Sequence, residues 1–426
     1  MKVVTVHRGQ RDNFQVARAL SDAGMLESLV TDLYWPSDRS WARTVEHLAP
    51  KRVARALRSR YTESLPSSSV VTSWLSGLYC LAVSKLHLIS FEKRRDTIRR
   101  CDLALGRRAG ELASRRGAAF LSYSYYAHSG FSHYTSDLPR ILFQLHPHPM
   151  SVRQILRKER DLHPECAESL DKEWELSLPE VDFERLVQEC GMAEHWMVAS
   201  SFSKQTLVEN GLPAHRIHVI PYGTDLDTFR PRRRGSSGRG PLQLLFVGTL
   251  GQRKGISYLL EAINLLPPNS VELTVCGRPV DDLGLFRQSQ VPVRLRPNAS
   301  ADELREAYQT SDLFVFPSVA EGFGHVLLEA MASGLPIIST TRTAAPDLIR
   351  EGKEGFVTQP GDSVQLAKCV EYFLQHPERL DPMRKAARQR AEHFTWERFR
   401  TGVAKTVAAI LEHPKNNWVS HACSKS

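Results

Sequence analysis

The sequence predicts an α/β protein with two doubly wound domains, each built around a parallel sheet. Two stretches begin as such domains do, with a short apolar run, a loop and a helical pattern: residues 3–23 and residues 244–265. A third stretch, residues 311–340, contains a complete strand–loop–helix–strand unit. Ligands bind at the carboxyl ends of the strands in such sheets, so the loops after these apolar runs are where a functional site is expected.

The composition is that of an ordinary globular protein, with 426 residues, 42% hydrophobic and 24% charged. This length suggests two or three domains. The seven cysteines are odd in number and scattered, which argues against a disulfide framework and a zinc site and favours a reducing compartment. The N-terminus enters a strand directly, and no signal peptide is visible, so we expect a cytoplasmic protein.

The net charge of +9 comes largely from the first third of the chain and from one linker. An anionic nucleotide, an acidic membrane surface and nucleic acid would all suit it. Nucleic acid is the weakest of the three, because the sequence has no RNA-binding fingerprint and no zinc-finger spacing. Residues 42–60 are basic and helical, with a break at Pro50. The uncharged run 65–84 is expected to be a buried helix, with a membrane-surface helix as the second interpretation.

Apolar strands of the first sheet are expected at residues 3–6, 29–33, 118–121 and 141–145, and a further strand of this domain begins at Trp196. A helix over residues 14–23 connects the first two. His146 directly follows the strand at 141–145, so its side chain can reach a cleft at the carboxyl edge of the sheet.

The second domain opens with a strand that ends at Gly248, followed by a loop that carries Arg253 and Lys254. Basic side chains on a loop that leads into a helix can neutralise a departing diphosphate. Taken alone, such a pair is more often simply solvated.

The third stretch places two glutamates, Glu321 and Glu329, with seven residues between them. Glu329 lies in a helical pattern that is apolar nearly all round, where a carboxylate costs several kcal/mol unless it is paired. The vicinal hydroxyls of a sugar would satisfy it. Gly322 and Gly324 leave backbone N–H groups uncovered at the start of that helix, where an anion such as phosphate is favoured. An isolated pair of glutamates would more often be solvated or bound to arginine.

The stretch 317–340, PSVAEGFGHVLLEAMASGLPIIST, closely resembles the signature of the retaining glycosyltransferases of family 4, the group 1 glycosyl transferases. These enzymes have the GT-B fold, in which two Rossmann-like domains face a central cleft. The resemblance implies that Glu321 lies by the donor sugar, that the loop Gly322, Phe323 and Gly324 contacts the diphosphate, and that Glu329 holds the ribose.

The resemblance extends to the remaining candidate residues. It places Lys254 on the leaving group, whereas Thr249 occupies the position of the usual arginine, a role that Arg253 is expected to take. His146 would contact the donor sugar from the opposite domain. The other residues expected around the donor are Gly248, Gly277 and Arg296, and Gly9 and Arg11 are expected on the acceptor side. We expect no metal and no other cofactor, because two cations in the cleft would neutralise the diphosphate without one.

The predicted organisation is an N-terminal acceptor domain completed by a C-terminal helix that crosses back, a linker, a C-terminal donor domain and a flexible tail. The respective ranges are 1–223 with 397–412, 224–240, 241–396 and 414–426.

The predicted activity is metal-independent, retaining transfer of a hexose from a nucleotide-diphosphate-sugar to a hydroxyl of a glycan, a lipid-linked or a small-molecule acceptor. A role in cell-surface polysaccharide or glycolipid synthesis, at the inner face of the membrane, would fit the basic first third. Two alternatives stay open: a nucleotide-sugar epimerase of the same architecture, and a non-catalytic basic scaffold on a membrane surface. A glycosidase needs two carboxylates that flank one bond, which suits the buried Glu329 poorly.

Overall fold

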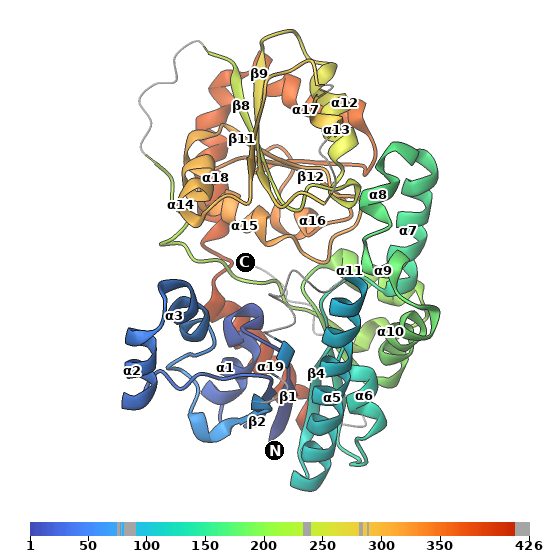
Figure 1. The fold of residues 1–426 in the computed structure, drawn as a ribbon. Helices are drawn as coiled ribbons and strands as arrows, with labels where there is room; N and C mark the ends of the chain where they lie inside the picture. The colour runs from blue at the N-terminus through green and yellow to red at the C-terminus, as the bar shows by residue number, and fades with distance from the viewer. Residues whose placement is uncertain are drawn as a thin grey trace.

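The computed structural model describes residues 1–413 except 75–76, 78, 81–90, 233–239, 281–283 and 288. The predicted tail 414–426 and much of the predicted linker 224–240 therefore lie outside the described residues. Two parallel sheets, each with helices around it, form two domains that lie one above the other (Figure 1). The predicted fold class, with two Rossmann-like domains, is confirmed.

The first sheet has seven strands in the order β3-β2-β1-β4-β5-β6-β7, and all neighbouring pairs are parallel. Its strands are β1 (Val3–Val6), β2 (Leu26–Thr31), β3 (Val70–Thr72), β4 (Ala119–Tyr123), β5 (Arg140–Gln144), β6 (His195–Val198) and β7 (Ile217–Val219). The central strands β1, β4, β5 and β6 are buried along nearly their whole length because helices cover both faces of such a sheet.

The helices of this domain are α1 (Gln15–Asp22), α2 (Ser40–Leu48), α3 (Lys51–Arg58), α5 (Phe91–Arg116), α6 (Ala127–Ser132), α7 (Pro149–Leu162), α8 (Ala167–Leu170), α9 (Trp174–Ser177), α10 (Glu180–Met192) and α11 (Ser201–Glu209). The predicted break at Pro50 is confirmed, because it separates α2 from α3. Among the described residues, no helix is both long enough and apolar enough to span a bilayer.

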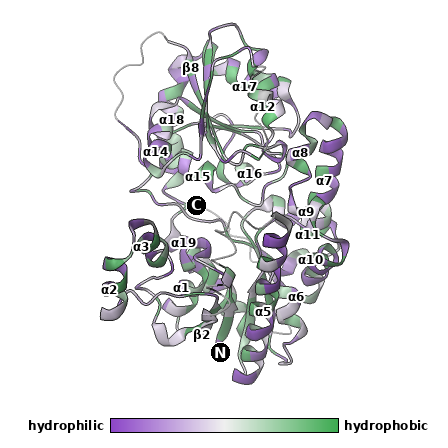
Figure 2. Ribbon diagram, viewed as in Figure 1, coloured by the Kyte–Doolittle hydropathy of each residue, from purple (hydrophilic) through white to green (hydrophobic). Residues whose placement is uncertain are grey.

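The second sheet has six parallel strands in the order β10-β9-β8-β11-β12-β13. They are β8 (Leu242–Val247), β9 (Val271–Gly277), β10 (Val293–Pro297), β11 (Leu313–Phe316), β12 (Ile337–Thr340) and β13 (Gly355–Thr358). The surrounding helices are α12 (Ile256–Asn264), α13 (Gly284–Arg287), α14 (Ala301–Thr310), α15 (His325–Ala332), α16 (Ala345–Leu348), α17 (Ser363–Gln375) and α18 (Leu380–Ala391). Hydrophobic residues follow these strands in both domains, and hydrophilic ones gather on the outer helices (Figure 2).

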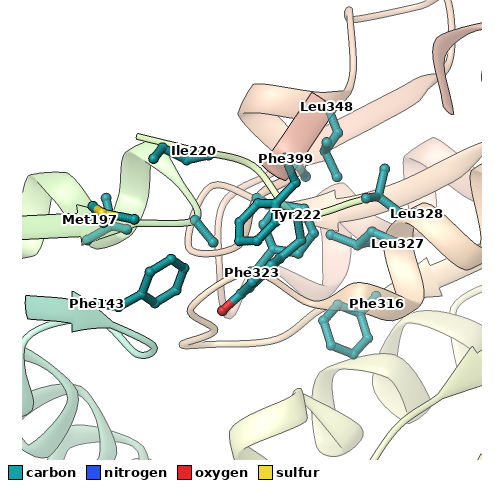
Figure 3. Packing of buried hydrophobic residues seen from close by; sticks show 14 of the residues in the cluster. Phe143, Met197, Ile220, Tyr222, Phe316, Phe323, Leu327, Leu328, Leu348 and Phe399 are labelled. Carbon is teal, nitrogen blue, oxygen red and sulfur yellow. The ribbon is translucent and has the colours of Figure 1, made fainter. Parts of the chain in front are cut away.

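The last helix, α19 (Trp396–Glu412), belongs to the first domain in space (Figure 1). It packs along α1, and Arg400 donates a hydrogen bond of 2.8 Å to the side chain of Gln15. Phe399 packs against Phe143 and Tyr222, and Phe323 of the second domain contacts the same Tyr222 ring (Figure 3). The predicted return of the C-terminal helix is confirmed, and an aromatic cluster joins the two domains where it returns.

The segment α7–α9 also connects the domains. Val152, Leu156 and Leu170 form a buried cluster with Tyr258 and Val319 of the second domain. In Figure 1, α7 and α8 extend beside that domain. The loop that carries Arg253 and Lys254 is therefore supported by residues of both domains.

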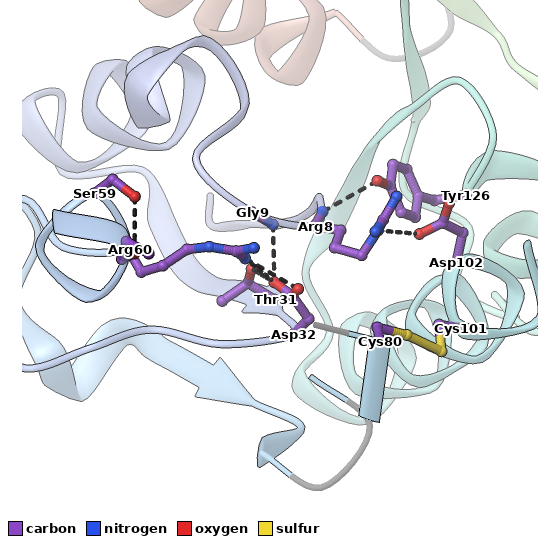
Figure 4. A network of polar contacts seen from close by, with 11 residues as sticks. Arg8, Gly9, Thr31, Asp32, Ser59, Arg60, Cys80, Cys101, Asp102 and Tyr126 are labelled. Atoms are coloured by element: carbon purple, nitrogen blue, oxygen red, sulfur yellow. Dashed lines mark hydrogen bonds and ion pairs between the residues drawn. A yellow bond between two sulfur atoms is a disulfide. The ribbon is translucent and has the colours of Figure 1, made fainter. Parts of the chain in front are cut away.

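Two local expectations are wrong. Residues 67–72, predicted to be helical, form a short 3-10 turn and strand β3, while residues 75–76, 78 and 81–84 of the same run lie outside the described residues. The expectation that the cysteines do not form disulfides fails at one pair, since Cys80 is bonded to Cys101 (Figure 4). The two residues come together because α5 brings Cys101 beside the segment that follows β3.

Candidate active site

A cavity of about 350 Å³ lies between the two domains, at the carboxyl ends of strands from both sheets. This volume falls within the range of small-ligand pockets. The residues that line it are Arg11, Leu145, His146, Tyr222, Val247, Gly248, Thr249, Lys254, Phe316, Glu321, Phe323, Gly324, His325 and Val326. Eight of the residues predicted from the sequence are among them: Arg11, His146, Gly248, Thr249, Lys254, Glu321, Phe323 and Gly324.

Lys254 and Glu321 form an ion pair in this cavity, with 16% and 13% of their side chains exposed. Gly255 makes this approach feasible, because its φ of +73° is left-handed and a Cβ there would clash with the carbonyl oxygen of Pro317. Burial lowers the pKa of Lys254, and the neighbouring Arg253 lowers it further. The Glu321 carboxylate in contact with the ammonium group favours its charged form.

The glycine loop after β11 is anchored to the first domain. The carbonyl of Gly322 accepts hydrogen bonds from the hydroxyls of Ser200 and Ser203, at 2.6 and 3.1 Å. A Cβ on Gly322 would clash with the carbonyl of Leu145, so the two backbones meet directly. Gly324, with φ +83°, begins α15, and the first turn of this helix faces the cavity. The N-terminus of α15 can therefore bind an anion there.

His146 faces this loop from the opposite domain. Its Nδ1 is buried and forms no hydrogen bond with any described residue. Burial holds the pKa of His146 well below its usual value, and the cations Arg253, Arg11 and Lys254 lower it further. The imidazole is consequently neutral at neutral pH, so it can exchange hydrogen bonds with a sugar hydroxyl.

Glu329 lies one turn beyond Val326 on the same face of α15, next to the cavity but not among its lining residues. The hydroxyl of Tyr308 donates a hydrogen bond of 2.9 Å to its carboxylate. Burial raises the pKa of Glu329, although the Tyr308 hydrogen bond opposes the shift. A half-buried carboxylate with one protein donor still has room for the two donors of a ribose.

Arg253 is not among the residues that line the cavity. Its guanidinium donates to the carbonyl of Ala320 at 3.0 Å and forms an ion pair of 3.0 Å with Glu173, which lies just before α9 in the first domain. The predicted role of Arg253 on the leaving group stays a prediction. The observed interactions of Arg253 hold the loop between the two domains together.

Three further predicted residues lie outside the cavity lining. Gly277 packs so closely on Gly248 that a Cβ would clash with the Gly248 carbonyl, which fixes the backbone beside the cavity. Arg296 forms an ion pair of 2.9 Å with Glu306. The N–H of Gly9 donates to Asp32, whose carboxylate also binds Arg60 (Figure 4).

Sequence reasoning missed Tyr222, which lines the cavity, as well as Tyr308 and Glu173, which support Glu329 and Arg253. Tyr222 could have been found, because it follows the last strand of the first sheet and precedes Gly223. Neither of the other two stands in a motif. In the part of the chain that the structure describes, no group of three or more His, Cys, Asp or Glu side chains is arranged to hold a metal ion.

Two Rossmann-like domains with a cavity between them form the GT-B fold. Sucrose-phosphate synthase from Thermosynechococcus elongatus superposes with a TM-score of 0.66 at 18% identity, over 97% of this chain and 99% of that one. Anabaena Alr3699/HepE, solved in complex with UDP-glucose, superposes with a TM-score of 0.58 at 15% identity, over 96% and 100%. At these identities the likeness concerns the fold.

Residues 229–390 match the family described as "Glycosyl transferases group 1". The sulfoquinovosyl transferase SQD2 of Arabidopsis thaliana is 30% identical over 210 residues, which are 46% of this chain and 41% of that protein. The chain spans about half the length, or less, of the curated relatives it matches. The match to the group 1 glycosyl transferases lies in the second domain, and the predicted resemblance is confirmed there.

Proposed function

We propose that this protein is a retaining glycosyltransferase, which moves a sugar from a nucleotide-diphosphate-sugar to a hydroxyl acceptor. The observation that carries the proposal is the cavity in which the Lys254–Glu321 pair, the N-terminus of α15 and a neutral His146 face one another. Lys254 and the backbone N–H groups of α15 can bind a leaving diphosphate, and Glu321 places a carboxylate beside it. His146 can form a hydrogen bond with a sugar.

In the proposed reaction, Glu329 binds the ribose, and Lys254 and the amides of the Gly322–Gly324 loop bind the diphosphate. The bond from the anomeric carbon to the diphosphate oxygen breaks, and its electron pair stays on that oxygen. The acceptor oxygen attacks from the same face, which retains the configuration, and its proton passes to the departing diphosphate. Glu321 stabilises the positive charge that develops at the anomeric carbon, and His146 positions the sugar. No step requires a metal or another cofactor.

The names of the similar proteins support a nucleotide-sugar donor. HepE was solved in complexes with UDP and with UDP-glucose, and SQD2 is a sulfoquinovosyl transferase. An epimerase of the same architecture would need no acceptor, so release of nucleotide that depends on an added acceptor separates the two functions.

We also propose that the acceptor is lipid-linked or part of a cell-surface polysaccharide, reached from the inner face of the membrane. A surface formed by helices α2 and α3, which we call the α2–α3 patch, supports a membrane-bound acceptor. Four apolar side chains are exposed there: Trp41 (52%), Val45 (42%), Leu48 (79%) and Val53 (44%). Residues 39–58 contain six lysines or arginines and one acidic residue. Apolar side chains among cations suit an anionic bilayer, in which the former insert and the latter bind headgroups.

The α2–α3 patch is connected to the cavity side of the first domain. Arg60, two residues after α3, binds Asp32, and Asp32 holds the N–H of Gly9 in the loop after β1 (Figure 4). A bilayer on the patch would thus present an acceptor to the loop that leads into the cavity.

The experiment that tests the transferase is thermal unfolding with UDP, GDP and ADP, followed by turnover of the matching nucleotide-sugars with glycan and lipid acceptors. One nucleotide should stabilise the protein by a few kcal/mol at saturation. Glu321→Gln should abolish turnover while nucleotide binding persists, and the anomeric configuration of the product, read by NMR, should match that of the donor. If no nucleotide stabilises the protein at millimolar concentration, the scaffold replaces the transferase as the better interpretation.

The membrane surface is tested by co-sedimentation with vesicles of phosphatidylglycerol and phosphatidylcholine. Trp41→Ser with Leu48→Ser should reduce binding several-fold, whereas Leu265→Ser, at an exposed position in the second domain, should not. Equal binding of all variants, or equal binding to vesicles without anionic lipid, would exclude the patch.

A further inference from the structure

We infer that Arg11, from the loop after β1 of the first domain, is the second cation that binds the departing diphosphate together with Lys254. The inference rests on the proposed function, because it assigns a residue to the donor site of that transferase. It moves Arg11 from the acceptor side, where the sequence placed it, to the leaving group.

The first argument is the charge available in the cavity. Among the described residues that line it, Arg11 and Lys254 are the arginine and lysine side chains. Lys254 already shares its charge with Glu321, Arg253 is engaged with Glu173, and position 249 holds a neutral threonine. A diphosphate that leaves without a metal needs more positive charge than Lys254 alone provides.

The second argument is that the guanidinium of Arg11 is free to bind a ligand. It forms no hydrogen bond or ion pair with any described residue, and its Cζ lies 6.0 Å from the centroid of the Tyr123 ring. Asp12, the adjacent acid, is occupied, because it accepts hydrogen bonds from the N–H of Gln15 at 3.1 Å and from the hydroxyl of Tyr123. All five N–H donors of Arg11 therefore remain available to an anion that enters the cavity.

The third argument is the backbone that holds Arg11 in place. Asp12, Asn13 and Phe14 follow it with φ angles of 43°, 51° and 62°, a left-handed conformation that residues other than glycine rarely adopt. Burial of the Phe14 ring between His7 and Tyr34 stabilises this turn. Strain of this kind gathers at functional sites, where it fixes a side chain in the orientation that the ligand needs.

The two cations also lie in the same cavity, since Arg11, Lys254 and His146 all line it. An anion between them would be held from both domains. When the anomeric C–O bond breaks, the electron pair on the diphosphate oxygens would accept hydrogen bonds from both side chains.

The test is calorimetric titration of the full chain with UDP, GDP and ADP and with the corresponding monophosphates. Arg11→Ala should weaken binding of the preferred diphosphate by about 10- to 100-fold, the effect of one charged hydrogen-bonding group. The affinity for the monophosphate should fall less, because Arg11 contacts the second phosphate, which the monophosphate lacks. Arg11→Lys should retain part of the affinity, and Thr249→Arg added to Arg11→Ala should restore part of it from the second domain. Arg107→Ala, at an exposed arginine of α5, is the control.

Unchanged diphosphate affinity in a folded Arg11→Ala variant would overturn the inference while the proposed function stands. A loss confined to the KM of the acceptor would also overturn it and return Arg11 to the acceptor side. If the wild-type protein binds none of the three nucleotides, the proposed function fails, and this inference fails with it.

Discussion

The ribose assignment of Glu329 leads to a prediction that separates a binding residue from a structural one. Glu329→Gln keeps an oxygen that can accept the 2.9 Å hydrogen bond of Tyr308, but it removes the negative charge. Each hydrogen bond between a ribose hydroxyl and a carboxylate contributes about 1.5–3 kcal/mol, so loss of two charged contacts should weaken nucleotide binding by roughly 100-fold or more. Stability without ligand should not fall, because burial of the charged carboxylate costs free energy that the amide does not incur.

The pH dependence gives this prediction a second readout. Because burial raises the pKa of Glu329 in the folded state, the native protein binds more protons than the unfolded chain in that pH range. The free energy of unfolding should therefore fall as the pH rises from the unfolded pKa of about 4.3 through the raised folded pKa, and Glu329→Gln should remove this part of the decline.

The assay is urea unfolding between pH 4 and pH 8, combined with calorimetric titration of the nucleotide, with the exposed Glu261→Gln on α12 as the control. A variant that binds nucleotide as the wild type does would refute the ribose assignment. A variant that is less stable without ligand would show that the carboxylate is structural.

Three further outcomes are expected. Burial lowers the pKa of Lys254, so the affinity for a nucleoside diphosphate, measured by calorimetric titration, should decline from about pH 7 to pH 10 as the ammonium loses its proton. Lys254→Arg should make this affinity nearly independent of pH over the same range. Glu173→Gln leaves the Arg253 guanidinium without its ion partner, and because one fifth of the Glu173 side chain is exposed, the free energy of urea unfolding should fall by only about 1–2 kcal/mol. Gly322→Ala should reduce transfer at least about tenfold, since its Cβ would clash with a backbone carbonyl of the first domain, whereas Gly191→Ala has open space and should have normal activity.

The sequence predicted the parts of the site that follow directly after a strand. Glu321 and Lys254 stand in loops at the carboxyl ends of two strands, and parallel pairing of β8 with β11 brings those ends together. Strand and loop patterns are local, so their consequences can be derived without knowledge of the rest of the chain. His146 follows the same rule in the other sheet, where it lies at the end of β5.

What the sequence did not predict depends on contacts between segments far apart in the chain. Nothing near Arg253 indicates that Glu173, 80 residues earlier, will bind it, because that pairing needs both domains and the α7–α9 segment in place. The wrong helix over residues 67–72 has a related cause. Those residues join the edge of the first sheet by pairing with β2, and this tertiary pairing overrides the local helical pattern.

The cavity depends on both domains for its chemistry as well as for its shape. The second domain supplies the paired Lys254 and Glu321, whereas the first supplies His146 and the free charge of Arg11. The loop that carries the glycine motif is itself held by Ser200 and Ser203 across the interface. A donor bound to the second domain alone would therefore meet only part of the charge it needs, and the leaving group would be stabilised only when the two domains are together. On this reasoning, the contacts between the domains belong to the proposed catalytic apparatus, because they decide when both cations face the diphosphate.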